Sequence, residues 1–430
     1  MNTITVREYA RLTTDQLQAP GLDRATISGA DFDELCVLNE HRGEGEASLL
    51  HQESRTSLRL RQYVGVLETK NGTRIEILPK TCEEKTDVGE VAQRERDLLR
   101  RMLMAALDVS AHEGPPSAIE RFRAPLFEWI IRRFLLELHN LLKRGLRFSY
   151  ERVAEERPFL RGSLDVGRQI VQPPQRRHLF HVRHDVFSAK RPEHRLLRKA
   201  LDRCLAATHD TENMRLAAPL RGILANIPPS ANVTVDFRQW NSGRHMAHYQ
   251  SVRPWCELVL GEHMPFALAG EWRGLSMLFP MEKLFEAHVA ACLRRHLRPG
   301  AALAAQASGM SLCRLGDASF FALRPDILIH CENTAYILDT KWKKLSGSLS
   351  SRFGISQHDV YQLFAYGHKY LQGKGDMALI YPMHHGFPIL EAPFRFSDPL
   401  RLWVTGWDLE KDRLIMPTDC PLRAILKESP

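Results

Sequence analysis

Apolar and polar residues alternate through much of the first 80 positions, and a period of two is typical of half-buried β-strands. The segment RQYVGVLETKNGTRIEILPK alternates on both sides of the Asn71-Gly72 dipeptide, which favours a tight hairpin turn. A two-residue turn there would place Val64 and Val66 on the same face as Ile75 and Ile77. The pattern therefore predicts a β-rich N-terminal region.

From about residue 88 the apolar residues recur every three or four positions, which predicts helices. The run PLFEWIIRRFLLELHNLLKRGL follows this pattern, and Gly145 is suited to end the helix. A second helical run is PEHRLLRKALDRCLAATHD, with Pro192 near its first turn. Proline-rich breaks at 172–175 and 227–230 interrupt this region. We therefore predict a mainly helical middle region.

The pattern changes again near residue 270, and from there helices and strands alternate. The predicted elements are a helix at 281–297, strands at 310–315, 320–330 and 335–342, a helix at 357–371 and a strand at 376–382. The chain is therefore expected to be a multidomain α+β protein. Its predicted parts are a β-rich N-terminal domain (1–87), a mainly helical middle region (88–269) and a C-terminal α/β domain (270–430).

The composition excludes several classes of protein. Hydrophobic content of 44% and charged content of 26% are normal for globular chains, so disorder is not expected. The net charge of +8 is a mild excess that is compatible with a polyanionic partner. No two of the eight cysteines form a C-x-x-C pair, so neither a zinc knuckle nor a disulfide framework is indicated. The chain has neither a signal peptide nor a membrane-spanning stretch, so we expect a soluble cytoplasmic protein without membrane contact.

Candidate chemistry lies on the segment RPDILIHCENTAYILDTKWKKL, which reads as two short strands joined by a turn. With the turn at 332–333, Asp326 would face Asp339, with Cβ atoms roughly 5 Å apart. Lys341 would point to the same face as Asp339, because strand side chains alternate. The register thus predicts that two carboxylates and one ammonium group converge.

Two carboxylates at that distance repel each other and raise one pKa unless a cation lies between them. Mg²⁺ prefers oxygen ligands, lowers the pKa of a bound water and offsets charge on a phosphodiester. We therefore predict that Asp326 and Asp339 bind Mg²⁺ and, with Lys341, catalyse phosphodiester hydrolysis. The alternative is an ordinary solvated hairpin, on which an Asp-x-Lys sequence is common.

Two helices are predicted to complete this site. Glu286 borders the apolar stripe of the helix at 281–297 and is a candidate third metal ligand; the alternative is a solvated residue at the helix edge. Gln362 and Tyr366 are four residues apart and share a helix face, which we expect to be turned towards the hairpin. They are candidate catalytic residues, and the alternative is a capping or packing role.

The order Asp, then Asp-x-Lys, on a hairpin between helices resembles the PD-(D/E)xK nuclease superfamily. QLFAY resembles the Gln-x-x-x-Tyr motif of its RecB-like branch. Together with this hairpin, YVGVLETKNGTRIEILPK and RPFLRGSLDVGRQI resemble the McrC family, the nuclease subunits of McrBC modification-dependent restriction systems, over about residues 55–385.

The resemblance implies a PD-(D/E)xK endonuclease domain that cuts DNA with Mg²⁺, using Asp326, Asp339 and Lys341. It also implies a partner, a McrB-like AAA+ GTPase hexamer that reads modified cytosine in double-stranded DNA. The N-terminal part of the chain would engage this partner and stimulate its GTP hydrolysis. The chain has no G-x-x-x-x-G-K-[ST] motif, so the partner is expected to bind the GTP. The segment HRGEGE (41–46) is a candidate contact loop or a plain solvated loop.

Two other functions stay open at this stage. A catalytically silent assembly factor could keep the nuclease fold and only activate the partner's GTPase. A stand-alone RecB-like exonuclease would cut DNA without the partner.

Overall fold

The chain forms two compact units in the computed structural model, one from residues 1–126 and 270–430 and the other from residues 127–269. The described residues are 3–40, 49–81, 87–107, 124–261 and 277–427. The contacts group the first and last predicted segments in one unit. The division into three domains remains a prediction. The candidate loop at 41–46 lies outside the described residues.

The N-terminal part of the first unit contains two small sheets. One has the order β1 (Thr3–Arg7), β7 (Arg74–Leu78), β6 (Tyr63–Glu68) and β11 (Met277–Pro280). The other has the order β3 (Arg24–Thr26), β2 (Arg11–Thr13), β5 (Ser57–Leu60) and β4 (Leu50–Ser54). The helices α1 (Gly29–Glu40) and α2 (Val88–Ala106) accompany them, and α2 packs against β7. The predicted β-rich character of this region is confirmed.

The hairpin predicted around Asn71 is formed by β6 and β7, but its faces differ from the prediction. The Thr69 amide donates to the Thr73 carbonyl at 2.9 Å, so the turn holds three residues instead of two. The additional residue shifts the register by one, and Val66 faces Glu76. The prediction that Val64 and Val66 share a face with the two β7 isoleucines is therefore wrong. Both faces of β6 and β7 are buried, so apolar residues suit either side.

The C-terminal part of the first unit is built on a seven-stranded sheet. Its order is β12 (Ala301–Ala305), β15 (Ile327–Cys331), β16 (Thr334–Thr340), β17 (Gly375–Pro382), β19 (Leu400–Asp408) and β18 (Phe394–Ser397), with β20 (Arg413–Ile415) on β19. The strands β16, β17 and β19 are parallel, so their carboxyl ends meet at one edge. We call this the carboxyl edge. The sheet is accompanied by α10 (Met281–His296) and α11 (Gln357–Tyr370), and by short 3-10 helices at Arg352–Gly354 and Pro421–Ile425.

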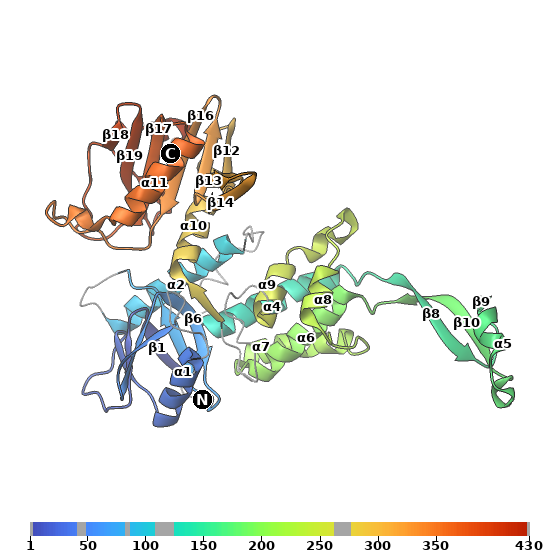
Figure 1. The fold of residues 1–430 in the computed structure, drawn as a ribbon. Coiled ribbons are helices and arrows are strands. Elements are labelled where there is room, and N and C mark those ends of the chain that lie inside the picture. Colours follow the sequence, from blue (N-terminus) through green and yellow to red (C-terminus); the bar gives the residue numbers. More distant parts are fainter. Residues whose placement is uncertain (1–2, 41–48, 82–86, 108–123, 262–276, 428–430) are drawn as a thin grey trace. The chain divides into compact units, whose positions relative to one another are not determined.

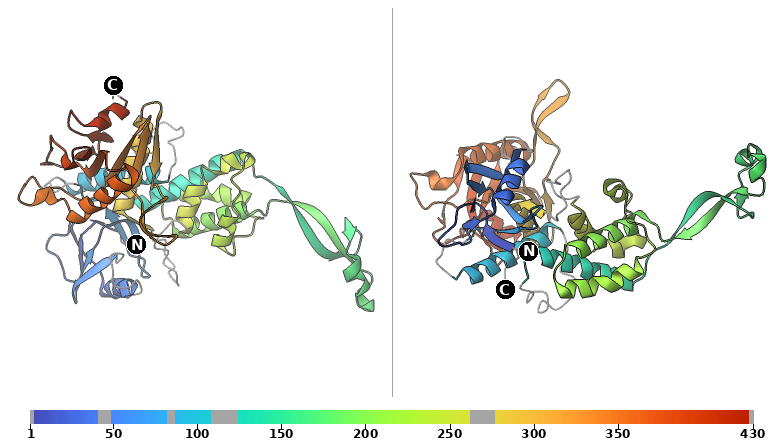
Figure 2. Two further views of the ribbon diagram at one scale, coloured as in Figure 1. Left: turned by 45° about the horizontal axis from the view of Figure 1, so that its top comes forward. Right: turned by 90° about the horizontal axis from the view of Figure 1, so that it is seen from below.

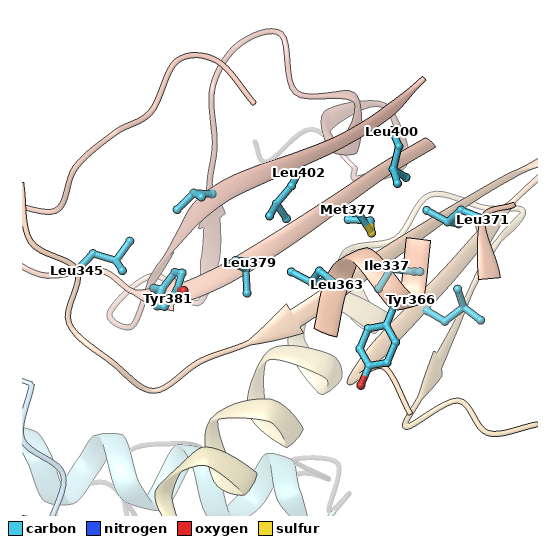
Figure 3. Packing of buried hydrophobic residues seen from close by; sticks show 12 residues of the cluster. Ile337, Leu345, Leu363, Tyr366, Leu371, Met377, Leu379, Tyr381, Leu400 and Leu402 are labelled. Carbon is cyan, nitrogen blue, oxygen red and sulfur yellow. The ribbon is translucent and has the colours of Figure 1, made fainter. Parts of the chain in front are cut away.

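One hydrophobic cluster fixes α11 on this sheet (Figure 3). Leu363 and Tyr366 of α11 belong to the same cluster as Ile337 of β16 and Leu379 of β17. The Tyr366 ring packs in the cluster while its hydroxyl points away from it. Because strand side chains alternate, Asp339 lies on the same face of β16 as Ile337. The sheet therefore presents Asp339 to the α11 side.

The predicted helices at 281–297 and 357–371 are confirmed as α10 and α11. The single strand predicted at 320–330 is wrong, because it is split into β14 (Ala318–Leu323) and β15. Pro325 lies in the break, and proline cannot donate a hydrogen bond to a strand ladder. β14 pairs with β13 (Met310–Leu315) and forms a separate two-stranded ribbon (Figure 2).

The second unit combines helices with a long β-hairpin. Its helices are α4 (Leu126–Lys143), α6 (Pro192–Ala207), α7 (Thr211–Ile223), α8 (Val233–Arg238) and α9 (Arg253–Leu260), with a 3-10 helix at Arg244–Tyr249. The hairpin contains β8 (Ser149–Arg157), β9 (Ser163–Leu164), α5 (Val166–Ile170), a 3-10 helix (Pro174–Arg176) and β10 (Phe180–Ser188). This segment, 149–188, extends away from the helices of the unit and is called the arm below (Figure 1).

The helix ends in this unit follow the sequence signals. Gly145 adopts a left-handed φ of 83° just after α4, and Pro192 is the first residue of α6. None of the helices in the described part of the chain is both long and apolar enough to cross a bilayer.

Candidate active site

A buried aspartate–lysine pair lies at the carboxyl edge. Asp339, on the inner strand β16, is fully buried. Lys341 follows the last residue of β16, and its amide donates to the Ile380 carbonyl, which continues the sheet by one residue. The Lys341 Nζ lies 2.5 Å from the Asp339 Oδ2. The prediction that these two side chains share a face is confirmed.

Asp326 reaches the same edge from the antiparallel neighbour. Ile327 pairs with Leu338, which is the register predicted from the turn at 332–333. Asp326 precedes this pair, and its Oδ2 accepts hydrogen bonds from the Thr340 amide and hydroxyl, both at 2.8 Å. Its carboxylate is thus fixed against the end of β16. The direct opposition of Asp326 and Asp339 stays a prediction.

The electrostatics of the edge favour a bound cation. Burial raises the pKa of Asp339 to about 7, and the nearby Asp326 carboxylate adds to the rise against the opposing effect of Lys341. Burial alone would lower the pKa of Lys341, but Asp339 and Asp326 raise it above its usual value. Lys341 is therefore protonated at neutral pH, while burial disfavours the ionised form of Asp339.

Glu286 on α10 is linked to Asp326 through a residue that the sequence did not indicate. Its Oε1 accepts from the Gln306 side chain at 2.9 Å, and its Oε2 lies 2.7 Å from the Lys283 Nζ. The backbone N–H of Gln306 in turn donates to the backbone carbonyl of Asp326 at 2.8 Å. The structure therefore brings Glu286 to the Asp326 segment, with both carboxylate oxygens engaged by protein groups.

Gln362 and Tyr366 share a face of α11, as predicted. Gln362 donates to the Tyr366 hydroxyl at 2.7 Å, and this hydroxyl donates to the Arg324 carbonyl at 3.0 Å. Arg324 lies two residues before Asp326. The pair therefore contacts the segment that carries Asp326.

The sequence reading also missed Asp359. This buried residue lies 3.4 Å from the Lys343 Nζ, and its charge contributes to the raised pKa of Asp339. Asp359 precedes Gln362 by three residues and Tyr366 by seven, so helical spacing could have placed it on their face. Gln306 offers no comparable signal, because its contacts come from the pairing of β12 with β15.

The donor atoms fit a hard cation at two of the three predicted ligands. Apart from the Lys341 ion pair, the buried oxygens of Asp339 have no hydrogen-bond partner among the described residues. The Oδ2 of Asp326 is engaged by Thr340, while no such bond occupies its Oδ1 within the described chain. Carboxylate oxygens are the ligands that Mg²⁺ prefers. Asp339 and Asp326 therefore fit the ion, whereas Glu286 would first have to release Lys283 or Gln306.

A second group of possible ligands has a simpler explanation. The donor atoms of His288, Cys292 and Asp412 lie within 4.8 Å of one another. Burial alone would lower the pKa of His288, but its 2.9 Å hydrogen bond to Asp412 and the nearby Cys292 raise it to about 9. Arg295 donates to the Cys292 sulfur at 3.0 Å. Because His288 and Arg295 supply positive charge next to Asp412 and Cys292, we interpret the three residues as part of an ion pair. This ion pair connects α10 with the turn after β19.

The fold and site define a multi-sheet α+β protein with an acidic, lysine-containing site at the carboxyl edge of its largest sheet. The model of the family described as McrBC 5-methylcytosine restriction system component matches residues 58–382. The chain belongs to this family. None of the curated proteins compared with the chain matches it significantly.

Two solved structures from Thermococcus gammatolerans contain similar chains. One is a refined half-complex from a tetradecameric assembly of McrB AAA+ hexamers with bound McrC; its chain is 20% identical, with a TM-score of 0.64 and 95% of each chain covered. The other is a cryo-EM structure of the McrBC complex; its chain is 21% identical, with a TM-score of 0.48, covering 68% of this chain and 88% of that one. The first likeness shows a shared fold.

Proposed function

We propose that this chain is the Mg²⁺-dependent DNA endonuclease subunit of a GTP-driven restriction complex that acts on modified cytosine. Membership of the McrBC family supports the system. The observation that carries the chemistry is the buried Asp339, paired with Lys341 beside Asp326 at the carboxyl edge. Burial disfavours the charged form of a carboxylate, and a bound cation favours it, so a cation at this place would offset the effect of burial on Asp339.

Asp326 and Asp339 are the proposed Mg²⁺ ligands. The bound ion would lower the pKa of a coordinated water and offset the charge of the phosphodiester. Thr340 holds the Asp326 carboxylate in place through two hydrogen bonds. Glu286 fixes the same segment through Gln306, and it is proposed as a further ligand only if it exchanges these contacts.

Lys341 supplies a positive charge that does not depend on the ion. Its pKa lies above the usual value, so the ammonium group stays protonated over the working pH range. In this position it orients the attacking water or stabilises negative charge on the phosphate. Gln362 and Tyr366 act through the Arg324 carbonyl and hold the Asp326 segment in register.

We also infer that the arm contacts the proposed partner, a McrB-like AAA+ GTPase hexamer that binds the GTP and reads the DNA. Large apolar side chains are exposed along it: Tyr150, Phe159, Leu160, Val166, Ile170, Val171 and Phe187. Exposed apolar groups gathered on one segment are typical of protein interfaces. The earlier expectation that the N-terminal part engages this partner stays a prediction beside this one.

A cleavage assay tests the proposal. The full chain is incubated with Mg²⁺ and DNA carrying modified cytosine, with and without a McrB-like GTPase and GTP. We expect cutting only in the complete mixture. Asp339→Ala and Lys341→Ala should each reduce the cutting rate by roughly 100-fold or more and leave the stimulation of GTP hydrolysis unchanged.

Two other outcomes identify the alternatives. Cutting without partner or GTP would favour a stand-alone exonuclease. Stimulated GTP hydrolysis without any cutting would favour a catalytically silent assembly factor. Loss of both activities in Asp339→Ala, with folding intact, would show that catalysis and partner activation are not separated as proposed.

A further inference from the structure

A cationic cavity of about 410 Å³ lies at the carboxyl edge, beside the candidate active site. Its walls include the segments that follow β16, β17 and β19, represented by Lys343, Met383 and Leu409. The N-terminal β region supplies Arg59 and Lys80. In open α/β sheets, ligands bind at the carboxyl ends of the strands. The position of the cavity is therefore that of a ligand site.

The charge of the cavity has one sign. Four basic side chains line it, Arg59, Lys80, Lys343 and Lys344, and its described lining contains no carboxylate. A neighbouring cavity of about 760 Å³ is different, because Glu95, Asp408 and Glu410 stand among its basic residues. The smaller cavity is therefore the one suited to a polyanion.

Two of the basic side chains, Arg59 and Lys80, can exchange their present partners for a ligand. Arg59, Lys80 and Lys343 lie 3.2–3.4 Å from Glu53, Asp23 and Asp359, respectively. The side chains of Arg59 and Lys343 are about half exposed. The Arg59–Glu53 and Lys80–Asp23 pairs join partly exposed side chains and contribute little to stability, so phosphate oxygens can replace these two carboxylates. Asp359 is buried, so Lys343 stays paired with it.

The two walls of the cavity are fastened to each other. The Trp342 indole donates to the buried Glu8 carboxylate at 2.8 Å, and the Trp342 carbonyl accepts from Gln62 at 2.9 Å. Trp342 directly follows Lys341. Tyr9, next to Glu8, lines the cavity with a left-handed φ of 63° and 42% of its surface exposed. A strained backbone that presents an aromatic ring among cations is typical of a binding site.

We propose that this cavity binds the phosphodiester backbone of the DNA strand that enters the Asp326–Asp339–Lys341 site. Arg59 and Lys80 are then DNA contacts contributed by the N-terminal β region, and Tyr9 offers a ring on which a base can stack. The inference rests on the proposed nuclease function and adds a substrate-binding surface to it.

DNA affinity is the direct test. The full chain carrying Asp339→Asn, which prevents cutting, is titrated with duplex DNA over a salt series, with and without Arg59→Gln and Lys80→Gln together. We expect the double substitution to weaken DNA binding by roughly 10-fold or more. The slope of the logarithm of the binding constant against the logarithm of the salt concentration should become less steep by about two. The pair Arg59→Lys and Lys80→Arg should restore binding, which separates loss of charge from loss of fold.

A matched control comes from the opposite edge of the sheet. Lys374 is exposed just before β17, whose carboxyl end lines the cavity. Lys374→Gln should leave DNA affinity and the salt slope unchanged. Because this control removes one charge and the test variant removes two, a loss of affinity about half as large on a logarithmic scale would attribute the effect to net charge and overturn the inference.

Three results distinguish the remaining possibilities. Unchanged DNA affinity and cutting in the Arg59/Lys80 variant would overturn the inference and leave the nuclease function standing. Normal DNA binding with lost GTPase stimulation would assign the cavity to an acidic segment of the partner. Absence of cutting by the natural chain under all conditions would refute the nuclease function, while the binding comparison would still decide whether the cavity holds DNA.

Discussion

At the scale of single residues, the site depends on the ionisation of Asp339. Its pKa in the folded chain is about 7, well above the ordinary value of 3.8, chiefly because the side chain is buried. The folded chain therefore retains a proton that the unfolded chain has lost between about pH 4 and pH 7. The contribution of this group to stability is full below pH 4 and is lost as the pH rises through 7.

Mg²⁺ should offset this loss, so its effect on stability should depend on pH. Mg²⁺ competes with the proton for Asp339, and binding should weaken by up to about tenfold for each pH unit below 7. We expect Mg²⁺ to raise the melting temperature at pH 8 clearly more than at pH 6. Thermal unfolding with and without Mg²⁺ measures this. Asp339→Asn should remove the effect and Glu8→Gln should keep it; equal shifts at both pH values would contradict the site.

Tyr366 should behave as a positioning residue. Removing its hydroxyl by Tyr366→Phe breaks the hydrogen bond to the Arg324 carbonyl and loosens the segment that carries Asp326. We expect kcat to fall by about tenfold, the equivalent of one net hydrogen bond, with little change in KM. Tyr361→Phe on the exposed face of α11 is the matched control. A change in KM alone would assign Tyr366 to substrate binding instead.

At the scale of elements, the ion pair between His288 and Asp412 connects α10 with the turn that follows β19. The pKa of His288 in the folded chain is about 9, above its ordinary value of 6.5, despite the opposing effect of burial. Its contribution to stability is therefore full below pH 6.5 and is lost as the pH rises through 9.

His288→Gln should accordingly destabilise the chain by about 2 kcal/mol at pH 7, because Asp412 loses its 2.9 Å bond to His288 and keeps only the longer 3.5 Å contact with Arg101. The difference between the variant and the natural chain should shrink towards pH 9.5. Urea unfolding at several pH values measures it, with the exposed His358→Gln as the control. A difference that does not change with pH would mean that packing, not charge, is lost.

The elements also show where sequence reasoning succeeds and fails. The register of β15 and β16 was predictable, because the turn at 332–333 lies directly between two short strands and determines which residues pair. The faces of β6 and β7 were not, because one additional turn residue reverses them and both sides are buried. Gln306 joins Glu286 to Asp326 through the pairing of distant segments, and no local pattern encodes such a contact. The strand residues of the candidate site could thus be predicted from the sequence. The contacts that Gln306 makes to Glu286 and Asp326 became evident only in the structure.

At the scale of the whole molecule, the arm and the site belong to different compact units. Ser149 and Ser188 are register partners at the base of the arm, so its ends are adjacent. The arm can therefore be removed without stretching the chain that remains.

Replacing residues 150–187 by Asn-Gly should leave the melting temperature of the first unit unchanged and abolish stimulation of the partner's GTP hydrolysis. The reason is that the deletion removes the exposed apolar surface and no residue of the sheet or the site. GTPase assays with a McrB-like protein measure the effect, and Tyr361→Phe serves again as a control. Full stimulation by the shortened chain would refute the role given to the arm.

The pairing of β11 with β6 also has a consequence for how the chain is made. Residues 277–280 pair with β6, which lies more than 200 positions earlier in the chain. During synthesis, this pairing can form only after the entire second unit has emerged from the ribosome. Until then β6 has an unpaired edge that can capture a foreign strand. We expect chains that end before residue 277 to aggregate through this edge more readily than the full chain.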